Sequence, residues 1–229
     1  MLTSVDAVLF DLDGTMVDTI PLILACYDHT LATHLPGYHP GRRVIIRNLG
    51  RSLDDILFDY AASGGAADPA SMSQTMLHTY RSFQRANLTR LIRPYEGMRD
   101  ALAGLRARGL TLGVVTSKAE WAARECYDYY GLGEFLSVHV FHGDTEKHKP
   151  DPQPLLHAAS QGGLDVARTV YVGDSIHDMA AGRAAGMRTI GALWGPSERD
   201  DLSQAGADEL ALTPPDLLEI VHRSTGVRS

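Results

Sequence analysis

The stretch from Ala7 to Gly14 constrains the fold most, because four apolar residues in a row end in two carboxylates separated by a single leucine. A short run without polar alternation is typical of a strand covered on both faces, and therefore of a parallel sheet flanked by helices. In such sheets, ligands bind beyond the carboxyl ends of the strands. We therefore expect Asp11 and Asp13 at the ligand-binding edge, where Gly14 lets the backbone turn sharply.

Taken alone, the run Asp11-Leu12-Asp13-Gly14 is equally typical of an ordinary turn. A calcium-binding EF-hand loop is excluded by its spacing. Such a loop needs glycine at its sixth position and glutamate at its twelfth. Counted from Asp11, Gly14 is fourth and Leu22 is twelfth.

The rest of the chain separates into a helical block and an alternating block. Apolar runs predict strands over 7–10, 111–115, 138–141, 169–172, 188–193 and 209–212. Helical periodicity predicts helices over 21–33, 44–49, 53–62, 72–86, 98–108, 119–130, 154–161 and 176–185. No strand is predicted between the first one and Thr111, and Asp68-Pro69 is expected to interrupt the helical block.

This order predicts an α/β fold with a Rossmann-like, doubly wound parallel sheet as its core and an inserted all-helical domain. We expect residues 1–17 and 92–229 to form the core and residues 18–91 to form the insertion. A chain of 229 residues with 44% hydrophobic content can bury a core of that size.

Charge and composition exclude several classes of function. A formal net charge of −7 disfavours nucleic acids or an anionic membrane as the main partner. The sequence shows no apolar stretch long enough to span a membrane and no signal-peptide pattern, so we expect a cytoplasmic protein. Its expected oligomeric state is a monomer or a homodimer. Cys26 and Cys126 lie far apart without metal-ligand spacing, and are expected to be buried free thiols.

Four predicted loops carry chemically active side chains. Asp11 and Asp13 follow the first strand, and the other three groups are Thr116-Ser117-Lys118, Lys149, and Asp174 with Asp178 one helical turn later. Each alone has an ordinary explanation: a helix cap for Thr116, Ser117 and Asp174, and a solvated surface charge for Lys149 and Asp178. Their joint occurrence at successive strand ends favours a phosphate site. The chain has only three lysines among 21 basic residues, and two of them fall in these groups.

This constellation resembles the haloacid dehalogenase superfamily. The four motifs of that family are an acid-x-acid-Gly-Thr loop, a Thr or Ser after the second strand, a downstream Lys, and Gly-Asp-x-x-x-Asp. Arg93-Pro94-Tyr95-Glu96-Gly97 and His148-Lys149-Pro150-Asp151-Pro152 further resemble the branch that contains phosphoglycolate phosphatases, bacterial pyrophosphatases and phosphoglucomutases. The resemblance runs from residue 7 to about residue 195. It implies that the helical block is a cap of the C1 type.

The resemblance implies a Mg²⁺-dependent phosphatase that acts on a small phosphorylated metabolite through an aspartyl phosphate. Asp11 would be the nucleophile, Asp13 the general acid and base, and Lys149 a positive charge beside Asp11 and the phosphoryl oxygens. The implied metal ligands are Asp11, the Asp13 backbone carbonyl, Asp174 and, directly or through water, Asp178. The implied phosphoryl and substrate contacts are Gly14, Thr15, Thr116, Ser117, Lys118 and Arg51.

Other chemistries can be weighed on the same residues. A signalling receiver domain also phosphorylates an aspartate with Mg²⁺, but it has no helical insertion and no second carboxylate like Asp13. Dehalogenases lack that second acid too, and phosphonate hydrolases need a cap lysine, whereas no lysine precedes Lys118. A phosphomutase shares every core motif and stays as the alternative, gripping its sugar phosphate through cap arginines such as Arg42, Arg43, Arg47 or Arg51.

A few residues outside the four motifs also receive expected roles. Residues 50–53 fall where related enzymes place a substrate-specificity loop, so Arg51 is expected to contact the leaving group. Asp18 is expected to position the cap linker. His142, His148 and His177 show no metal-ligand spacing and are expected to be structural or to lie on the rim of the site.

Overall fold

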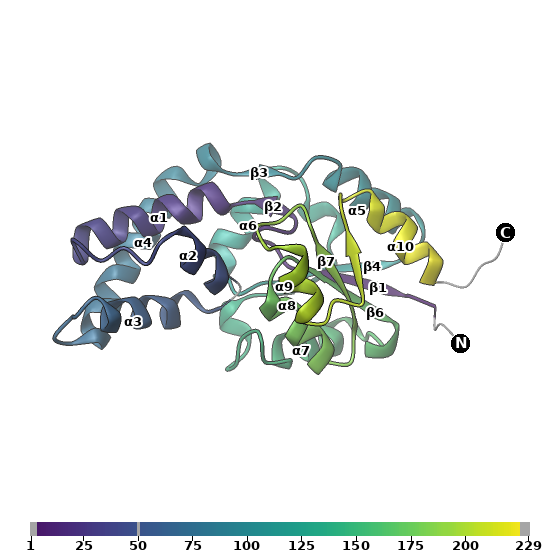
Figure 1. Ribbon diagram of the computed structural model, residues 1–229. Coiled ribbons are helices and arrows are strands. Elements are labelled where there is room, and N and C mark those ends of the chain that lie inside the picture. Colours follow the sequence, from purple (N-terminus) through teal and green to yellow (C-terminus); the bar gives the residue numbers. More distant parts are fainter. Residues whose placement is uncertain (1–3, 50, 225–229) are drawn as a thin grey trace.

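The computed structural model describes residues 4–49 and 51–224, and its centre is a parallel sheet of six strands in the order β5-β4-β1-β6-β7-β8 (Figure 1). All six strands were predicted, with ends that agree within one residue. Their bounds are β1 (Ala7–Phe10), β4 (Thr111–Val115), β5 (Val138–Val140), β6 (Thr169–Gly173), β7 (Arg188–Ala192) and β8 (Glu209–Ala211). Because β1 lies between β4 and β6, the loops after these three strands meet at one edge.

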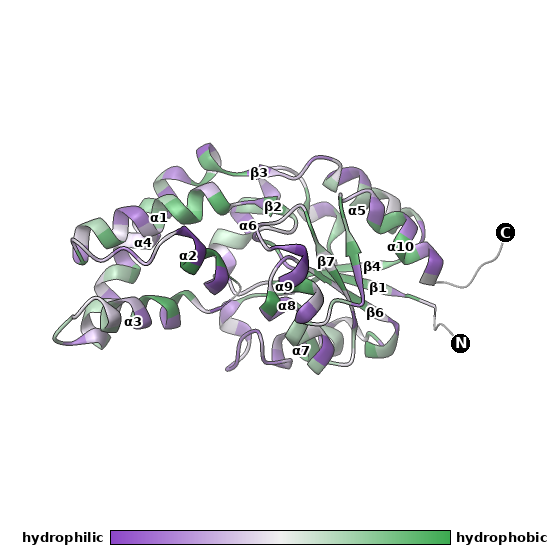
Figure 2. Ribbon diagram, in the orientation of Figure 1, coloured by the Kyte–Doolittle hydropathy of each residue, from purple (hydrophilic) through white to green (hydrophobic). Residues whose placement is uncertain are grey.

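Helices cover both faces of this sheet, which explains why β1 is apolar throughout. Val8 and Phe10 pack with the helices of one face, whereas Leu9 packs with those of the other. The first face carries α5 (Met98–Ala107), α6 (Glu120–Asp128) and α10 (Asp216–Ser224), and the second carries α7 (Gln153–Gly162) and α8 (Ile176–Ala184). Figure 2 shows hydrophobic colour along the central strands. The predicted doubly wound α/β core is confirmed.

Two core helices were not predicted. The short α9 (Arg199–Gln204) buries only Leu202, so it carries no hydrophobic periodicity. In α10 the apolar residues Leu217, Ile220 and Val221 do have helical spacing, but a nine-residue segment offers a weak signal.

The described residues of the insertion form four helices between β1 and the core helix α5, and these lie to the left of the sheet in Figure 1. They are α1 (Ile20–His34), α2 (Arg42–Asn48), α3 (Leu53–Ser63) and α4 (Pro69–Leu91). The expectation of no strand before Thr111 is wrong, because β2 (Val17–Asp18) and β3 (Arg93–Pro94) form an antiparallel pair where the chain enters and leaves the insertion. Strands of two residues are too short to show an alternating pattern.

Helix α4 extends beyond the predicted range 72–86 at both ends. The predicted break before it is present, since α3 ends at Ser63, but Asp68-Pro69 belongs to the start of α4. The Asp68 carboxylate accepts a hydrogen bond from the Ser71 N–H at 3.1 Å, and Pro69 occupies the first turn. Both α1 and α3 pack against α4. Tyr27 lies edge-on to Tyr60 and Tyr80, with ring centroids 5.7 and 5.1 Å apart, which ties these helices together.

No helix within residues 4–49 and 51–224 combines the length and the apolar character needed to cross a membrane.

Candidate active site

The loop after β1 places Asp11 and Asp13 at the edge predicted from the sequence. The Asp11 N–H still donates to the Val172 carbonyl of β6 at 2.9 Å, which anchors the residue to the sheet. The chain then turns at Gly14, whose φ of +87° is in the left-handed region. A Cβ at Gly14 would lie 2.5 Å from Asp174 Oδ2, so only glycine fits beside that carboxylate.

Lys149 lies between two of the carboxylates. Its Nζ is 2.6 Å from Asp11 Oδ1, 2.7 Å from Asp178 Oδ1 and 3.1 Å from the Tyr171 hydroxyl, and all four side chains are buried. Burial alone would lower the pKa of Lys149, but the two carboxylates raise it well above its ordinary value. Lys149 therefore stays charged in the interior, where a cation and its partners interact strongly.

Asp11, Asp174 and Asp178 form a cluster in which one oxygen of each lies within 4.8 Å of the others. Burial raises the pKa of Asp11 to about 7, although Lys149 acts to lower it. Burial, and then the charges of Asp178 and Asp11, raise the pKa of Asp174 well above its usual range. Only Lys149 pairs with this cluster within the described chain, so a second cation is needed to keep all three carboxylates ionised.

The donor set of this cluster fits Mg²⁺, which prefers carboxylate oxygens. Asp174 Oδ1 accepts a hydrogen bond from the Thr15 hydroxyl at 2.7 Å, whereas its buried Oδ2 has no donor among the described residues. Both oxygens of Asp178 accept hydrogen bonds, from Lys149 and Tyr171 on one side and from Ser175 on the other. Asp178 therefore has no oxygen without a donor, whereas Asp11 and Asp174 each keep one such oxygen, Oδ2, among the described residues.

Two parts of this cluster were not found from the sequence. A Cβ at Gly195 would lie 2.4 Å from the Asp174 Cβ and 2.7 Å from the Gly14 carbonyl oxygen, so Gly195 closes the space around Asp174. Tyr171 touches both Lys149 and Asp178 from inside β6. The sequence signal for Tyr171 was a hydroxyl between two valines of the strand, and Gly195 carried none.

Asp13 is held separately from this cluster. Lys118 Nζ lies 2.8 and 2.7 Å from the two Asp13 carboxylate oxygens, and the Thr19 hydroxyl donates to Oδ1 at 2.6 Å. Burial acts to lower the pKa of Lys118, but the Asp13 charge outweighs it and the pKa is raised. Lys118, expected at the phosphoryl group, thus contacts the second carboxylate. Nearby, the buried Thr116 hydroxyl accepts the Lys118 N–H at 3.2 Å.

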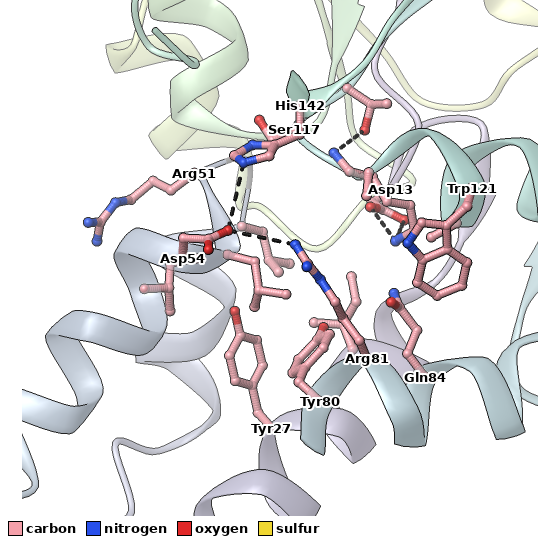
Figure 3. Close-up of a pocket in the computed structure, with 18 of the residues that line it drawn as sticks. Asp13, Tyr27, Arg51, Asp54, Tyr80, Arg81, Gln84, Ser117, Trp121 and His142 are labelled. Atoms are coloured by element: carbon pink, nitrogen blue, oxygen red, sulfur yellow. Dashed lines mark hydrogen bonds and ion pairs between the residues drawn. The ribbon is translucent and has the colours of Figure 1, made fainter. Parts of the chain in front are cut away.

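A pocket lies between the helical insertion and this edge of the sheet (Figure 3). The sheet side supplies Asp11, Asp13, Thr116, Ser117, Lys118 and Trp121, and the insertion supplies Tyr27, Arg51, Asp54, Tyr80, Arg81 and Gln84. The Arg51 guanidinium donates to Asn48 Oδ1 and Asp59 Oδ2, both at 2.8 Å, and points away from the other labelled side chains in Figure 3. Gly50, expected in the same loop, lies outside the described residues.

The three histidines lie where the insertion meets the core. His142 lines the pocket, with Nε2 3.7 Å from Asp54 Oδ2, and its ring stacks on His148 at 4.2 Å. His177 Nε2 is 3.2 Å from the Arg47 carbonyl oxygen. Asp18 accepts the Ile20 N–H at 3.2 Å, at the start of α1.

Cys26 and Cys126 are buried free thiols, as predicted. Burial raises the pKa of each to about 12.

A parallel sheet with an acid-x-acid loop after its central strand, a buried lysine and two further carboxylates defines a class of hydrolases. Residues 8–192 match the sequence model described as haloacid dehalogenase-like hydrolase. The chain therefore belongs to this family, as its motifs indicated.

Individual relatives are similar over almost the whole chain. Pyrophosphatase PpaX of Halalkalibacterium halodurans is 35% identical, over 95% of this chain and 97% of that protein. N-acetylmuramic acid 6-phosphate phosphatase of Pseudomonas aeruginosa is 33% identical, over 95% of each. Among solved structures, a predicted phosphoglycolate phosphatase from Haemophilus somnus has a TM-score of 0.82 at 22% identity, covering 96% of this chain and 99% of its own. This last likeness shows the fold alone.

Proposed function

We propose that this protein is a Mg²⁺-dependent phosphatase that hydrolyses a small phosphorylated metabolite in the cytoplasm. One observation carries the proposal. Asp11 lines the pocket with only its Oδ1 held by a donor of the described chain, and a second carboxylate, Asp13, lines the same pocket. One carboxylate is thus available to attack phosphorus while the other handles a proton. The names of the relatives, a pyrophosphatase and a sugar-acid phosphatase, support phosphate as the group removed.

Asp11 and Asp174 would hold the metal, together with the Asp13 backbone carbonyl. Asp178 would act by orienting Lys149, to which it is bonded. Mg²⁺ held there would neutralise charge on the phosphoryl oxygens and so let an anionic nucleophile approach phosphorus.

The side chains have complementary tasks in this mechanism. An Asp11 carboxylate oxygen attacks phosphorus and forms an aspartyl phosphate, while Asp13 gives a proton to the departing oxygen. Asp13 then takes a proton from the water that hydrolyses the aspartyl phosphate. Lys149 offsets the charge beside Asp11, and the Thr116 hydroxyl with Ser117 hydrogen-bonds the phosphoryl oxygens. Gly14 and Thr15 shape the loop, and Lys118 with Thr19 orients Asp13.

The helical insertion would act as a cap. We place the core at residues 1–17 and 92–229 and the cap at residues 18–91, because the β2–β3 pair lies where the chain enters and leaves the insertion. The cap side of the pocket would exclude water and contact the leaving group, and Arg51 stays a candidate for such a contact. Phosphoglycolate-like and pyrophosphate-like compounds suit a pocket of this kind.

Phosphate release from a panel of pyrophosphate, phosphoglycolate and sugar phosphates tests this function. We expect release with Mg²⁺, none with a chelator, and recovery when Mg²⁺ is restored. Stoichiometric phosphorylation without turnover on every compound would instead indicate a phospho-acceptor domain, and isomerised sugar phosphate without free phosphate would indicate a phosphomutase.

A further inference from the structure

Helix α4 buries two polar side chains, Ser73 and Gln84, on the face that packs inward. The Ser73 hydroxyl donates to the Ala70 carbonyl at 2.9 Å, so among the described residues of this face Gln84 is the one without an evident partner. The stripe that packs inward contains Met76, Leu77, Tyr80 and Leu88, and Gln84 continues it at helical spacing. Gln84 is only 5% exposed. An amide at such a position costs free energy unless its donors and acceptor find partners.

The Gln84 amide has no hydrogen-bond partner in the part of the chain that the structure describes. It lines the pocket below Asp13, and Figure 3 shows it pointing from α4 towards that carboxylate. A primary amide offers two N–H donors and one acceptor. Gln84 is therefore a buried hydrogen-bonding group aimed at the space where a substrate would lie.

Arg81 lies one turn earlier on the same helix and points into the same pocket (Figure 3). Its one ion pair in the described chain, to Asp54, spans 3.9 Å, which is longer than a hydrogen bond. The same Asp54 oxygen, Oδ2, also lies 3.7 Å from His142 Nε2. By contrast, Arg51 makes two hydrogen bonds of 2.8 Å within the cap. Arg81 thus keeps most of its planar set of donors for a ligand.

The geometry points to Arg81 and Gln84 as specificity-determining residues that bind an anionic oxygen on the leaving group. This inference rests on the proposed phosphatase function. On the core side of the pocket, Lys118 is occupied by Asp13, so the cap supplies the charge that faces the leaving group. A guanidinium and an amide N–H, three residues apart on one helix face, suit the oxygens of a carboxylate or of a second phosphate.

Two substrates of nearly equal size show whether the enzyme recognises an anionic leaving group or binds any small phosphate ester. Phosphoglycolate and hydroxyethyl phosphate differ in that a carboxylate replaces a hydroxymethyl group, and pyrophosphate tests the second form of anion. For the unaltered enzyme we expect higher kcat/KM on phosphoglycolate or pyrophosphate than on hydroxyethyl phosphate. We define the selectivity ratio as kcat/KM on phosphoglycolate or pyrophosphate divided by kcat/KM on hydroxyethyl phosphate. Arg81→Met should lower this ratio about 10- to 100-fold and Gln84→Leu about 2- to 10-fold, mainly through a higher KM for the anionic substrate.

Two controls separate recognition from folding. Arg90→Met removes a positive charge from the same helix outside the pocket, and should leave the ratio unchanged. Gln84→Leu restores the apolar stripe, so its Tm should equal or exceed that of the unaltered protein, whereas a structural role predicts a lower Tm.

The outcomes distinguish the two proposals. Phosphate release from all three substrates with a ratio near one, or a ratio that Arg81→Met leaves intact, overturns this inference while the phosphatase function stands. Absence of phosphate release from every substrate, with Mg²⁺ present and the protein folded, overturns the proposed function and this inference with it.

Discussion

At the scale of single residues, Lys149 is expected to contribute both to stability and to catalysis, because it is buried between Asp11 and Asp178. Replacement by methionine would leave both carboxylates without their cation. We expect Lys149→Met to lower the free energy of unfolding by about 3–5 kcal/mol and kcat by about 100- to 1000-fold. Urea unfolding and phosphate release measure the two effects.

Lys147 provides the matched control from the same loop. Its side chain is 69% exposed and pairs with Asp151 at the surface, so Lys147→Met should leave stability and kcat almost unchanged. Equal stability of the two variants would show that the buried ion pairs described here do not hold the site together.

The carboxylate cluster also predicts how stability depends on pH. Burial raises the pKa of Asp11 from 3.8 to about 7, so its protonated form favours the folded state and that contribution is lost as pH rises towards about 7. The raised pKa of Asp174 acts in the same direction. The pKa of Asp178 is lowered, because Lys149 and Ser175 outweigh its burial, so Asp178 adds no change in this window.

Metal-free protein should therefore become less stable between about pH 5 and pH 7, and Mg²⁺ should raise Tm more at about pH 8 than at about pH 5.5, because it binds the ionised carboxylates. Scanning calorimetry with and without Mg²⁺ measures both. In Asp11→Asn the Mg²⁺ effect should shrink at both pH values. An Mg²⁺ shift that is independent of pH and of Asp11 would argue against this cluster as the metal site.

At the scale of secondary-structure elements, helices α4 and α6 meet across the pocket. The Arg85 guanidinium lies 4.5 Å from the centroid of the Trp121 ring, which joins the insertion to the core. We expect Arg85→Leu to raise KM about two- to fivefold with little change in kcat, because in the proposed function this interaction would help the insertion to close over the substrate. Steady-state kinetics give this split, and an effect on kcat alone would point to a different role for the contact.

The elements also show what the sequence could reveal. The central strands are continuous apolar runs, so their existence and their ends were predictable. The β2–β3 pair and α9 are too short for periodicity to be seen. The start of α4 was predicted too late, because Asp68-Pro69 was taken only as a breaker when it also begins the helix. Hydrophobic patterns along the chain thus identify long helices and strands, and miss short ones that form only through contact with neighbouring elements.

At the scale of the whole molecule, the motif residues were predictable because they follow strands that parallel pairing brings to one edge. Lys149 was expected beside Asp11 from the family resemblance, but three other contacts were not expected. Lys118 contacts Asp13, Arg51 is bonded within the cap, and Gly195 closes around Asp174 from a loop after β7. The contacts of Lys118 and Gly195 join segments far apart in sequence, whereas Arg51 bonds to Asn48 and Asp59 nearby. The pattern of one segment does not reveal which partner a side chain takes.

The central claim is that Asp11 receives the phosphoryl group and Asp13 is needed to release it. Asp13→Asn should slow the second step, so acid-quenched protein incubated with Mg²⁺ and a phosphorylated substrate should carry one phosphoryl group on Asp11 by peptide mass spectrometry. The label should be absent with a chelator and in the Asp11→Asn, Asp13→Asn double variant. A phosphoryl group on any other residue, or undiminished turnover by Asp11→Asn, would contradict the account.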